Sequence, residues 1–256
     1  IRAVAERRRG TRHCDLWQQL QLVVRVLGTT GSNDLALPAL GSYLFSPAAT
    51  RELDASRLPN TALLTAVRAL SGRDDDQAGY RWLFDYANLG VEELGSVYES
   101  LLELHPDVDL GTNTFSLTTG GKERRATGSH YTPPAILKRV LDFALDPVIT
   151  RALTAPDPEA ALLDLRVLDP AVGSGHFLSA AAHRLARALA TVRTGEAAPP
   201  PGDTRRALRD VVARCLYGVD LNPMAVELCR VALWLETLEP GKPLSFLDHH
   251  IRAGNS

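Results

Sequence analysis

The chain has 256 residues, of which 45% are hydrophobic and 23% charged, a composition typical of globular proteins that excludes a disordered tail. Its formal net charge of -2 gives no evidence for binding to nucleic acid, so any such contact would have to come from local patches. No apolar run reaches membrane-spanning length, no signal peptide opens the chain, and the three cysteines form no Cys-x-x-Cys pair. These features predict a cytoplasmic protein with buried free thiols. Because the first residue is Ile1 rather than Met, we expect a piece of a longer protein.

The N-terminal part of the chain is predicted to be mainly helical. An amphipathic stretch ending near Leu27 is preceded by the basic residues Arg7, Arg8, Arg9 and Arg12. We interpret this basic lead as a solvated helix start, with contact to phosphate groups as the alternative. Residues 28–59 are expected to form a long ordered loop, after which Asn60 is predicted to cap a helix that continues to Leu70.

The middle of the chain contains weaker signals. The acids at 74–76 lack the alternating spacing of a calcium loop and are interpreted as a surface turn. A helical segment is expected at 91–104, and residues 115–118 are predicted to form one strand of a small hairpin. The basic run at 122–125 is either a solvated loop or a contact with nucleic acid.

A helix is predicted to start at Thr132, because a threonine is followed there by Pro133 and Pro134. Its packed face is predicted to comprise Ile136, Leu137, Val140, Leu141, Ala144 and Leu145. The free amides of the first turn and the Thr132 hydroxyl can hold a carboxylate, and the alternative is a simple capped helix.

The segment from Val167 to Phe177 predicts a strand, a tight loop and a helix. A short apolar run ends at Asp169, Gly173 and Gly175 follow, and the next helix has an apolar stripe. Glycine permits backbone angles closed to other residues and lets a ligand approach the main chain. We therefore expect a ligand-binding loop here, although a plain strand-to-helix turn remains the alternative.

The residues beside the two glycines restrict the class of ligand. His176 and Phe177 stand where a triphosphate-binding loop requires lysine and serine or threonine. Leu178 stands where a dinucleotide fingerprint requires a third glycine. A loop with an acid before it and no lysine suits a ligand with an ammonium group and no phosphate, and S-adenosylmethionine is such a ligand.

A second short strand, 216–220, also ends in an acid, and Asn222 then opens another helix. The Asp220 carboxylate can accept both hydroxyls of a ribose, so Asp220 is predicted to bind ribose; the alternative is that it only tethers its loop. Between the two strands, residues 195–202 are predicted to be disordered, and Thr204 is expected to cap a helix. Strands that alternate with helices predict a parallel, Rossmann-like sheet.

The stretches 168–178 and 217–223 resemble the adenine-specific (N6) DNA methyltransferases of bacterial restriction-modification and phage-defence systems, especially large type IIG-like enzymes. Residues 127–133 look like the upstream cofactor motif of that family, and residues 89–104 look like its helical lead-in. His130 stands where relatives often have tyrosine or phenylalanine, and it is given no role. The resemblance implies an S-adenosylmethionine site made by Tyr131, Thr132, Pro133, Asp169, Ala171, Gly173, Gly175, Phe177, Asp220, Asn222 and Asn255.

The end of the chain, 254–256, resembles the third cofactor motif, in which Asn255 would meet the adenine amino group; an ordinary turn is the alternative. The catalytic motif of the family is Asn or Asp, two prolines and an aromatic residue, and it holds the flipped base. No stretch of this sequence matches it. We therefore assign no catalytic residue and no metal ligand, and we expect this chain alone to be inactive.

The sequence as a whole predicts an α/β protein. A mainly helical region at 1–125 is followed, at 126–256, by the first half of a Rossmann-like S-adenosylmethionine-dependent methyltransferase sheet. The intact protein is expected to methylate adenine at specific DNA sites, with DNA and subunits of a defence system as partners and no membrane. A non-catalytic scaffold or regulatory subunit is the alternative. A small-molecule methyltransferase is disfavoured by the helical lead-in and the Asp-Pro-Ala opening of the loop.

Overall fold

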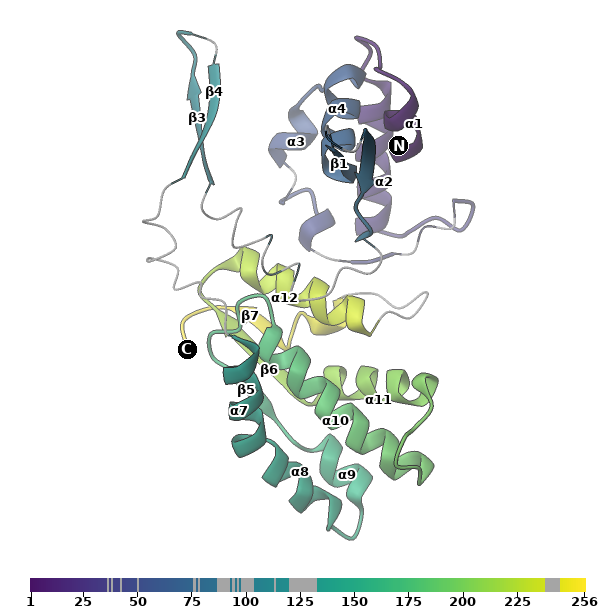
Figure 1. The fold of residues 1–256 in the computed structure, drawn as a ribbon, viewed down its shortest axis with the longest axis vertical. Coiled ribbons are helices and arrows are strands. Elements are labelled where there is room, and N and C mark those ends of the chain that lie inside the picture. Colours follow the sequence, from purple (N-terminus) through teal and green to yellow (C-terminus); the bar gives the residue numbers. More distant parts are fainter. Residues whose placement is uncertain are drawn as a thin grey trace. The chain divides into compact units, whose positions relative to one another are not determined.

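The computed structural model describes residues 1–86, 104–119, 133–237 and 245–256, apart from 36, 38, 42, 50, 76, 78 and 113, together with residues 93, 95 and 97. The chain divides into two compact units, which are Ile1–Leu89 with Pro240–Ser245 and Gly90–Glu239 with Phe246–Ser256 (Figure 1). The sequence predicts a methyltransferase domain at 126–256. The division into compact units does not test these limits, which stay a prediction.

In its described residues, the first unit consists of helices and one hairpin. Its elements are α1 (Arg2–Arg7), α2 (Asp15–Gly28), η1 (Tyr43–Phe45), α3 (Arg51–Ala55), α4 (Asn60–Ser71), β1 (Gly72–Asp75) and β2 (Tyr80–Leu83). The two strands pair antiparallel, with Asp74 opposite Arg81. The surface turn predicted for these acids is therefore wrong for Asp74 and Asp75, which lie in β1. Charge pairing across the hairpin and with the preceding helix accompanies this strand, because the Asp74 carboxylate lies 2.9 Å from the Arg81 guanidinium and 3.2 Å from that of Arg68.

Asn60 is the first helical residue of α4, and Pro59 holds the cap position that was predicted for Asn60. The Asn60 amide oxygen accepts a hydrogen bond of 3.2 Å from the Leu16 backbone N–H, and its amide nitrogen donates one of 2.8 Å to Asp15. Its side chain therefore satisfies the first turn of α2 rather than that of its own helix. A capping pattern along the sequence does not reveal such a contact between helices.

The second unit contains a hairpin of β3 (Leu104–Asp109) and β4 (Thr114–Thr119). These strands pair antiparallel over their whole length, which confirms the hairpin predicted at 115–118. Residues 93, 95 and 97 are helical, as expected, whereas Leu104 lies in β3 rather than in that helix. The basic run at 122–125 lies outside the described residues.

The rest of the unit alternates helices with a parallel sheet. Its elements are α7 (Pro134–Ala144), α8 (Asp146–Leu153), α9 (Pro158–Leu163), β5 (Val167–Asp169), α10 (His176–Thr194), α11 (Pro201–Arg214), β6 (Leu216–Asp220), α12 (Pro223–Glu236), η3 (Ser245–Leu247) and β7 (Ile251–Ala253). The three strands lie in the order β5-β6-β7, and both neighbouring pairs are parallel. The described chain is thus a mixed α/β protein, in which the carboxyl ends of these strands share one edge of the sheet.

The proline-rich stretch at 195–202, which was predicted to be disordered, contains the end of one helix and the start of the next. Gly195 ends α10 in the left-handed conformation, with φ of 72°. Pro201 then begins α11, three residues before the predicted cap, Thr204. Proline suits the first helical position because its fixed φ is that of a helix and its missing N–H would have no partner there.

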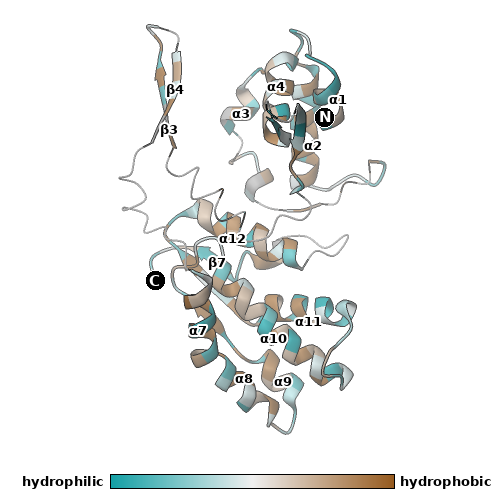
Figure 2. Cartoon of the chain, in the orientation of Figure 1, coloured by the Kyte–Doolittle hydropathy of each residue, from teal (hydrophilic) through white to brown (hydrophobic). Residues whose placement is uncertain are grey.

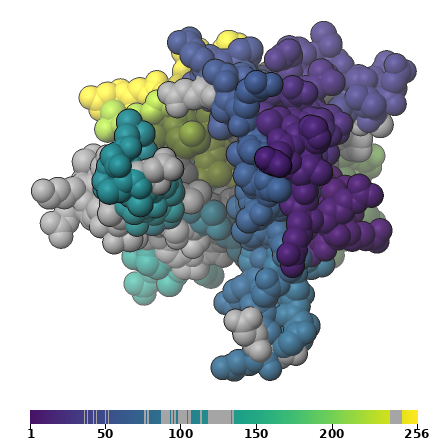
Figure 3. All heavy atoms as spheres, turned by 90° about the horizontal axis from the view of Figure 1, so that it is seen from above, coloured from purple at the N-terminus to yellow at the C-terminus, as the bar shows by residue number. Residues whose placement is uncertain are grey.

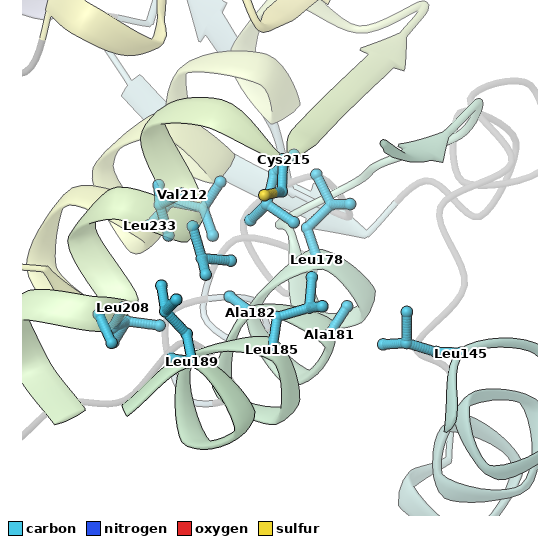
Figure 4. Packing of buried hydrophobic residues seen from close by; sticks show 14 of the residues in the cluster. Leu145, Leu178, Ala181, Ala182, Leu185, Leu189, Leu208, Val212, Cys215 and Leu233 are labelled. Carbon is cyan, nitrogen blue, oxygen red and sulfur yellow. The ribbon is translucent and has the colours of Figure 1, made fainter. Parts of the chain in front are cut away.

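The core of the second unit lies around α10. The apolar stripe predicted for this helix is confirmed, because Leu178, Ala181, Leu185 and Leu189 are all fully buried. Figure 4 shows Leu185 and Leu189 gathered with Leu208 of α11. Along α10 and α11, hydrophobic and hydrophilic residues alternate, as amphipathic helices require (Figure 2).

The stripe predicted for α7 is confirmed only in part. Leu141 and Leu145 are buried, with 2% and 7% of their surface exposed, and they join the same core. Ile136 and Val140, however, are 53% and 41% exposed, because the neighbouring helices described here cover only one side of α7. Helical spacing identifies apolar residues on a helix, but it cannot say how wide a face the neighbours will cover.

Cys215 and Cys229 are buried free thiols, as predicted, whereas Cys14 is only partly buried. Burial raises the pKa of the Cys215 thiol to about 11, so this group stays protonated at neutral pH. None of the helices in the described ranges is long and apolar enough to cross a membrane.

Candidate functional site

The carboxyl ends of the three parallel strands bring the predicted site residues to one edge of the sheet. Asp169 ends β5 and Asp220 ends β6. Asp220 is opposite Ala253 of β7, and the Asp220 backbone carbonyl accepts a 2.9 Å hydrogen bond from the Gly254 N–H. Asn255 follows directly and is exposed. Ligands of open α/β sheets bind at such an edge, outside the carboxyl ends of the strands.

The loop after β5 is fixed to β6 by hydrogen bonds from its backbone. The Val172 N–H donates to the Val219 carbonyl at 2.9 Å, and the Gly173 N–H donates to the Asp220 carboxylate, also at 2.9 Å. Within the loop, the Gly175 N–H donates to the Val172 carbonyl at 2.9 Å. The loop therefore has a defined shape before any ligand arrives.

Both carboxylate oxygens of Asp220 accept backbone hydrogen bonds. One accepts from the Gly173 N–H, and the other accepts from the Asn222 N–H at 2.8 Å. Asp220 thus tethers its loop, which was the alternative to a ribose-binding role. The two roles are compatible, because a carboxylate offers about four lone-pair sites and two remain. The ribose contact itself stays a prediction.

Gly173 and Gly175 both have positive φ, of 53° and 90°, but for different reasons. A Cβ atom added at Gly175 would lie 2.8 Å from the Cys229 sulfur of α12, so this glycine allows the helix to pack against the loop. A Cβ atom added at Gly173 would meet nothing within 4 Å. The space beside Gly173 is therefore open for a ligand, whereas Gly175 supports the fold.

The two strand-end acids form a negatively charged pair of groups. The Asp169 carboxylate accepts a 3.0 Å hydrogen bond from the Ala171 N–H. Burial raises the pKa of Asp169 above its ordinary value, and the negative charge of Asp220 adds to this rise. A cationic ligand would stabilise the charged form of both carboxyls, so the electrostatics of this edge favour a positively charged group.

The remaining predicted residues have varied surroundings. Ala171 is exposed in the loop, and Phe177 is half-buried against the core. Asn222 caps α12 by accepting a 2.9 Å hydrogen bond from the Met224 N–H, as predicted. Pro133 holds the cap position of α7, which packs against α10. Tyr131 and Thr132 lie outside the described residues.

Two glycines that received no role from the sequence also shape the site. Gly218 lies inside β6, and a Cβ atom there would be 2.8 Å from the Val172 side chain, so Gly218 lets the loop cross the strand. Gly95 is buried, and a Cβ atom there would lie 2.5 Å from the His176 ring and 2.6 Å from the Ser174 hydroxyl. A glycine in a strand interior is a usable signal of close backbone approach. Gly95, by contrast, lies against residues 174 and 176, which are too far away in the sequence for a local pattern to predict the contact.

Comparison with known proteins relates this chain to DNA methyltransferases. Residues 157–242 match the family model of the DNA-methyltransferase domain of MmeI. The chain is 25% identical, over 209 residues, to a Methanocaldococcus jannaschii protein whose name is that of a type II restriction enzyme and methyltransferase. It is 31% identical, over 144 residues, to the adenine-specific methyltransferase PglX of Streptomyces coelicolor. These matches confirm the predicted resemblance to methyltransferases of restriction-modification type.

The fold is similar to that of the type IIL restriction-modification enzyme MmeI, solved in complex with DNA, with a TM-score of 0.54 and 18% sequence identity. The match covers 99% of this chain and 32% of MmeI. The two sequence relatives are matched over 66% and 56% of this chain, but over only 16% and 9% of their own lengths. This chain therefore spans a small part of the relatives that it matches.

We predict that Gly175→Ala destabilises the chain more than Gly173→Ala, by about 1–3 kcal/mol, the usual cost of overpacking a buried site. Both variants bear the strain of a positive φ, but only the first forces a methyl group against Cys229. Urea unfolding followed by circular dichroism measures the difference. In a Cys229→Ala background the difference should shrink, and an unchanged difference would contradict the packing role of Gly175.

The raised pKa of Asp169 leads to a pH-dependent prediction. The Asp169 carboxyl binds its proton more tightly in the folded chain than in the unfolded chain. The free energy of unfolding therefore falls as pH rises from the ordinary pKa of this carboxyl through its raised pKa. Asp169→Asn should therefore be more stable than the unchanged chain at neutral pH, and the gap should narrow as acid protonates Asp169. Asp107→Asn, at an exposed position of β3, is the control in the same urea titrations. A gap that is constant with pH would argue against this account.

Proposed function

Because this chain is related to the DNA methyltransferases of restriction-modification systems, we propose that it is the S-adenosylmethionine-binding portion of a site-specific DNA N6-adenine methyltransferase. The observation that supports this most directly is the open space beside Gly173, in a loop whose backbone is held by Asp220. A ligand can approach the main chain there without displacing a side chain.

The chemistry of the edge fits this cofactor. S-adenosylmethionine would supply a methyl group on a positively charged sulfonium, and its ammonium group adds a second positive charge. The paired acids Asp169 and Asp220 favour a cation, and no lysine or arginine lies in the loop from Asp169 to Gly175 to hold a phosphate. In this proposal the free lone pairs of Asp220 accept the ribose hydroxyls, and Asn255 meets the adenine amino group.

The other proposed contacts follow from the family resemblance. Tyr131, Thr132 and Pro133 would line the methionine end of the cofactor, where the start of α7 offers unpaired amides for a carboxylate. Ala171 and Gly173 would contact the cofactor from the loop after β5. Phe177, at the start of α10, and Asn222, at the start of α12, would contact it from the two helix starts. Gly175 contributes by keeping α12 against the loop.

The sheet is consistent with the first half of a Rossmann-like methyltransferase. Its strand order, β5-β6-β7, with helical crossovers between parallel neighbours, would form one half of a doubly wound arrangement. The whole protein would act on DNA in the cytoplasm, together with subunits of a defence system. Because the sequence contains no Asn or Asp followed by two prolines and an aromatic residue, the step at the target adenine would depend on residues beyond this chain.

Calorimetric titration with S-adenosylmethionine tests the cofactor site through two matched variants. Gly173→Val should abolish binding, because the side chain would fill the proposed ligand space. Gly195→Val is the control, because Gly195 also has a positive φ, of 72°, and nothing within 4 Å, yet it lies at the far end of α10. Both variants bear similar backbone strain. Loss of binding in both, or in neither, would sink the assignment of Gly173.

Asp220→Ala in the same titration should weaken binding by about 1–3 kcal/mol, the cost of leaving polar groups without their partner. Circular dichroism must show that the variant is folded, since Asp220 also tethers the loop. An unchanged affinity in a folded Asp220→Ala variant would leave the carboxylate with its tethering role alone.

The chain alone is predicted to transfer no methyl group to DNA. Methyl transfer requires the adenine amino group to be held in line with the donor, and such positioning contributes roughly 7–11 kcal/mol to lowering a barrier. The measurement is incorporation of labelled methyl groups into unmethylated DNA by this chain, compared with the same protein extended beyond Ser256. Methylation by the chain alone would show that the missing motif is dispensable. Absence of activity in a cofactor-binding extended protein would favour a non-catalytic scaffold.

A further inference from the structure

A cavity of about 590 Å³ lies between the end of α1 and the side of α4, in the first unit. It is lined by Ala5, Glu6, Arg7, Arg8, Arg9, Leu64, Thr65 and Arg68. Half of these eight residues are arginines. We call this feature the arginine cavity. Figure 3 shows the N-terminal segment, in dark purple, at the surface of the first unit.

Of the four arginines, Arg68 is paired with Glu6 and Asp74, so the unbalanced positive charge of the arginine cavity lies on the other three. Its one acid, Glu6, lies 3.3 Å from the guanidinium groups of both Arg68 and Arg81, so its charge is already balanced. Arg7, Arg8 and Arg9 are exposed, and none of them forms an ion pair with any residue that the structure describes. The first 14 residues contain five arginines and one glutamate, whereas the whole chain has a net charge of -2.

The backbone that follows these arginines is held in place. Gly10 has a φ of 83°, and a Cβ atom there would lie 2.7 Å from the Asn60 carbonyl carbon. The Thr61 N–H donates to the Thr11 carbonyl at 3.1 Å, and the Asn60 N–H donates to the His13 carbonyl at 2.7 Å. The first amides of α4 therefore clamp the segment.

We propose that the arginine cavity binds phosphate groups of the backbone of double-stranded DNA. Guanidinium groups match phosphate oxygens with paired hydrogen bonds, and a row of them on a fixed backbone loses little entropy on binding. Such contacts carry no sequence information, so the first unit would hold the duplex in place for the rest of the protein. The proposal rests on the proposed function for its choice of DNA as the polyanion. It changes our interpretation of Arg7–Arg9 from a solvated helix start to a phosphate contact.

The test measures binding of this chain to a fluorescent DNA duplex by anisotropy at several salt concentrations. Arg8→Ala with Arg9→Ala should weaken binding and make the logarithmic salt dependence less steep by about 1.8, or roughly 0.9 for each lost phosphate contact. Arg205→Ala with Arg214→Ala is the matched control, because it removes the same charge from exposed positions of α11 that form no ion pair with any residue the structure describes. We expect the control to keep the affinity and salt slope of the unchanged chain.

The proposal would be overturned by no DNA binding by the unchanged chain, by no effect of the Arg8 and Arg9 variant on that binding, or by an equal loss in both double variants, which would indicate a general charge effect. A separate titration with inorganic phosphate distinguishes a site for small anions. If the chain binds phosphate through Arg8 and Arg9 but binds no duplex, DNA is excluded as the ligand of this cavity. Calorimetry with S-adenosylmethionine on the same samples separates the two proposals. Normal cofactor binding with no effect of the arginine variants on DNA would leave the proposed function standing and remove this inference.

Discussion

The site depends on one interaction, the pair of hydrogen bonds that the Asp220 carboxylate accepts from the backbone. Through Gly173 it holds the loop after β5, and through Asn222 it holds the turn that begins α12. Two crossovers of the sheet therefore meet at one side chain. A charged acceptor makes these hydrogen bonds stronger than neutral ones, and partial burial limits competition from water. A cofactor that contacts Asp220 would therefore bind a carboxylate that already holds the loop through two backbone hydrogen bonds.

Close backbone packing around this interaction explains the glycines. Gly175 admits the Cys229 sulfur, and Gly218 admits the Val172 side chain, so the loop can lie directly on β6 and α12. Of these three glycines, Gly173 alone could take a Cβ atom that has no neighbour within 4 Å. The same tight packing that makes two glycines structural thus leaves the third beside open space. The shape of the ligand space is a consequence of how the sheet and helices pack.

Charge is divided between the two units. The edge of the sheet in the second unit presents Asp169 and Asp220, which favour a cationic ligand, whereas the first unit presents Arg7, Arg8 and Arg9, which favour an anionic one. A net charge near zero conceals both features, because opposite charges cancel in the sum. Local charge, and not composition, carries the information about binding partners here.

Local patterns in the sequence determined the strand, loop and helix from Val167 onward, the cap at Asn222 and the buried stripe of α10, because each depends on residues only a few positions apart. Only the tertiary structure decided that Asn60 supports α2, that Asp74 lies in a strand, and that half of the predicted α7 face stays exposed. It also separated the roles of Gly173 and Gly175, which look equivalent in the sequence. Except for Asp74, whose partners lie six and seven residues away, these outcomes depend on contacts between residues far apart in the chain, and spacing along a sequence contains no information about which distant surfaces will meet.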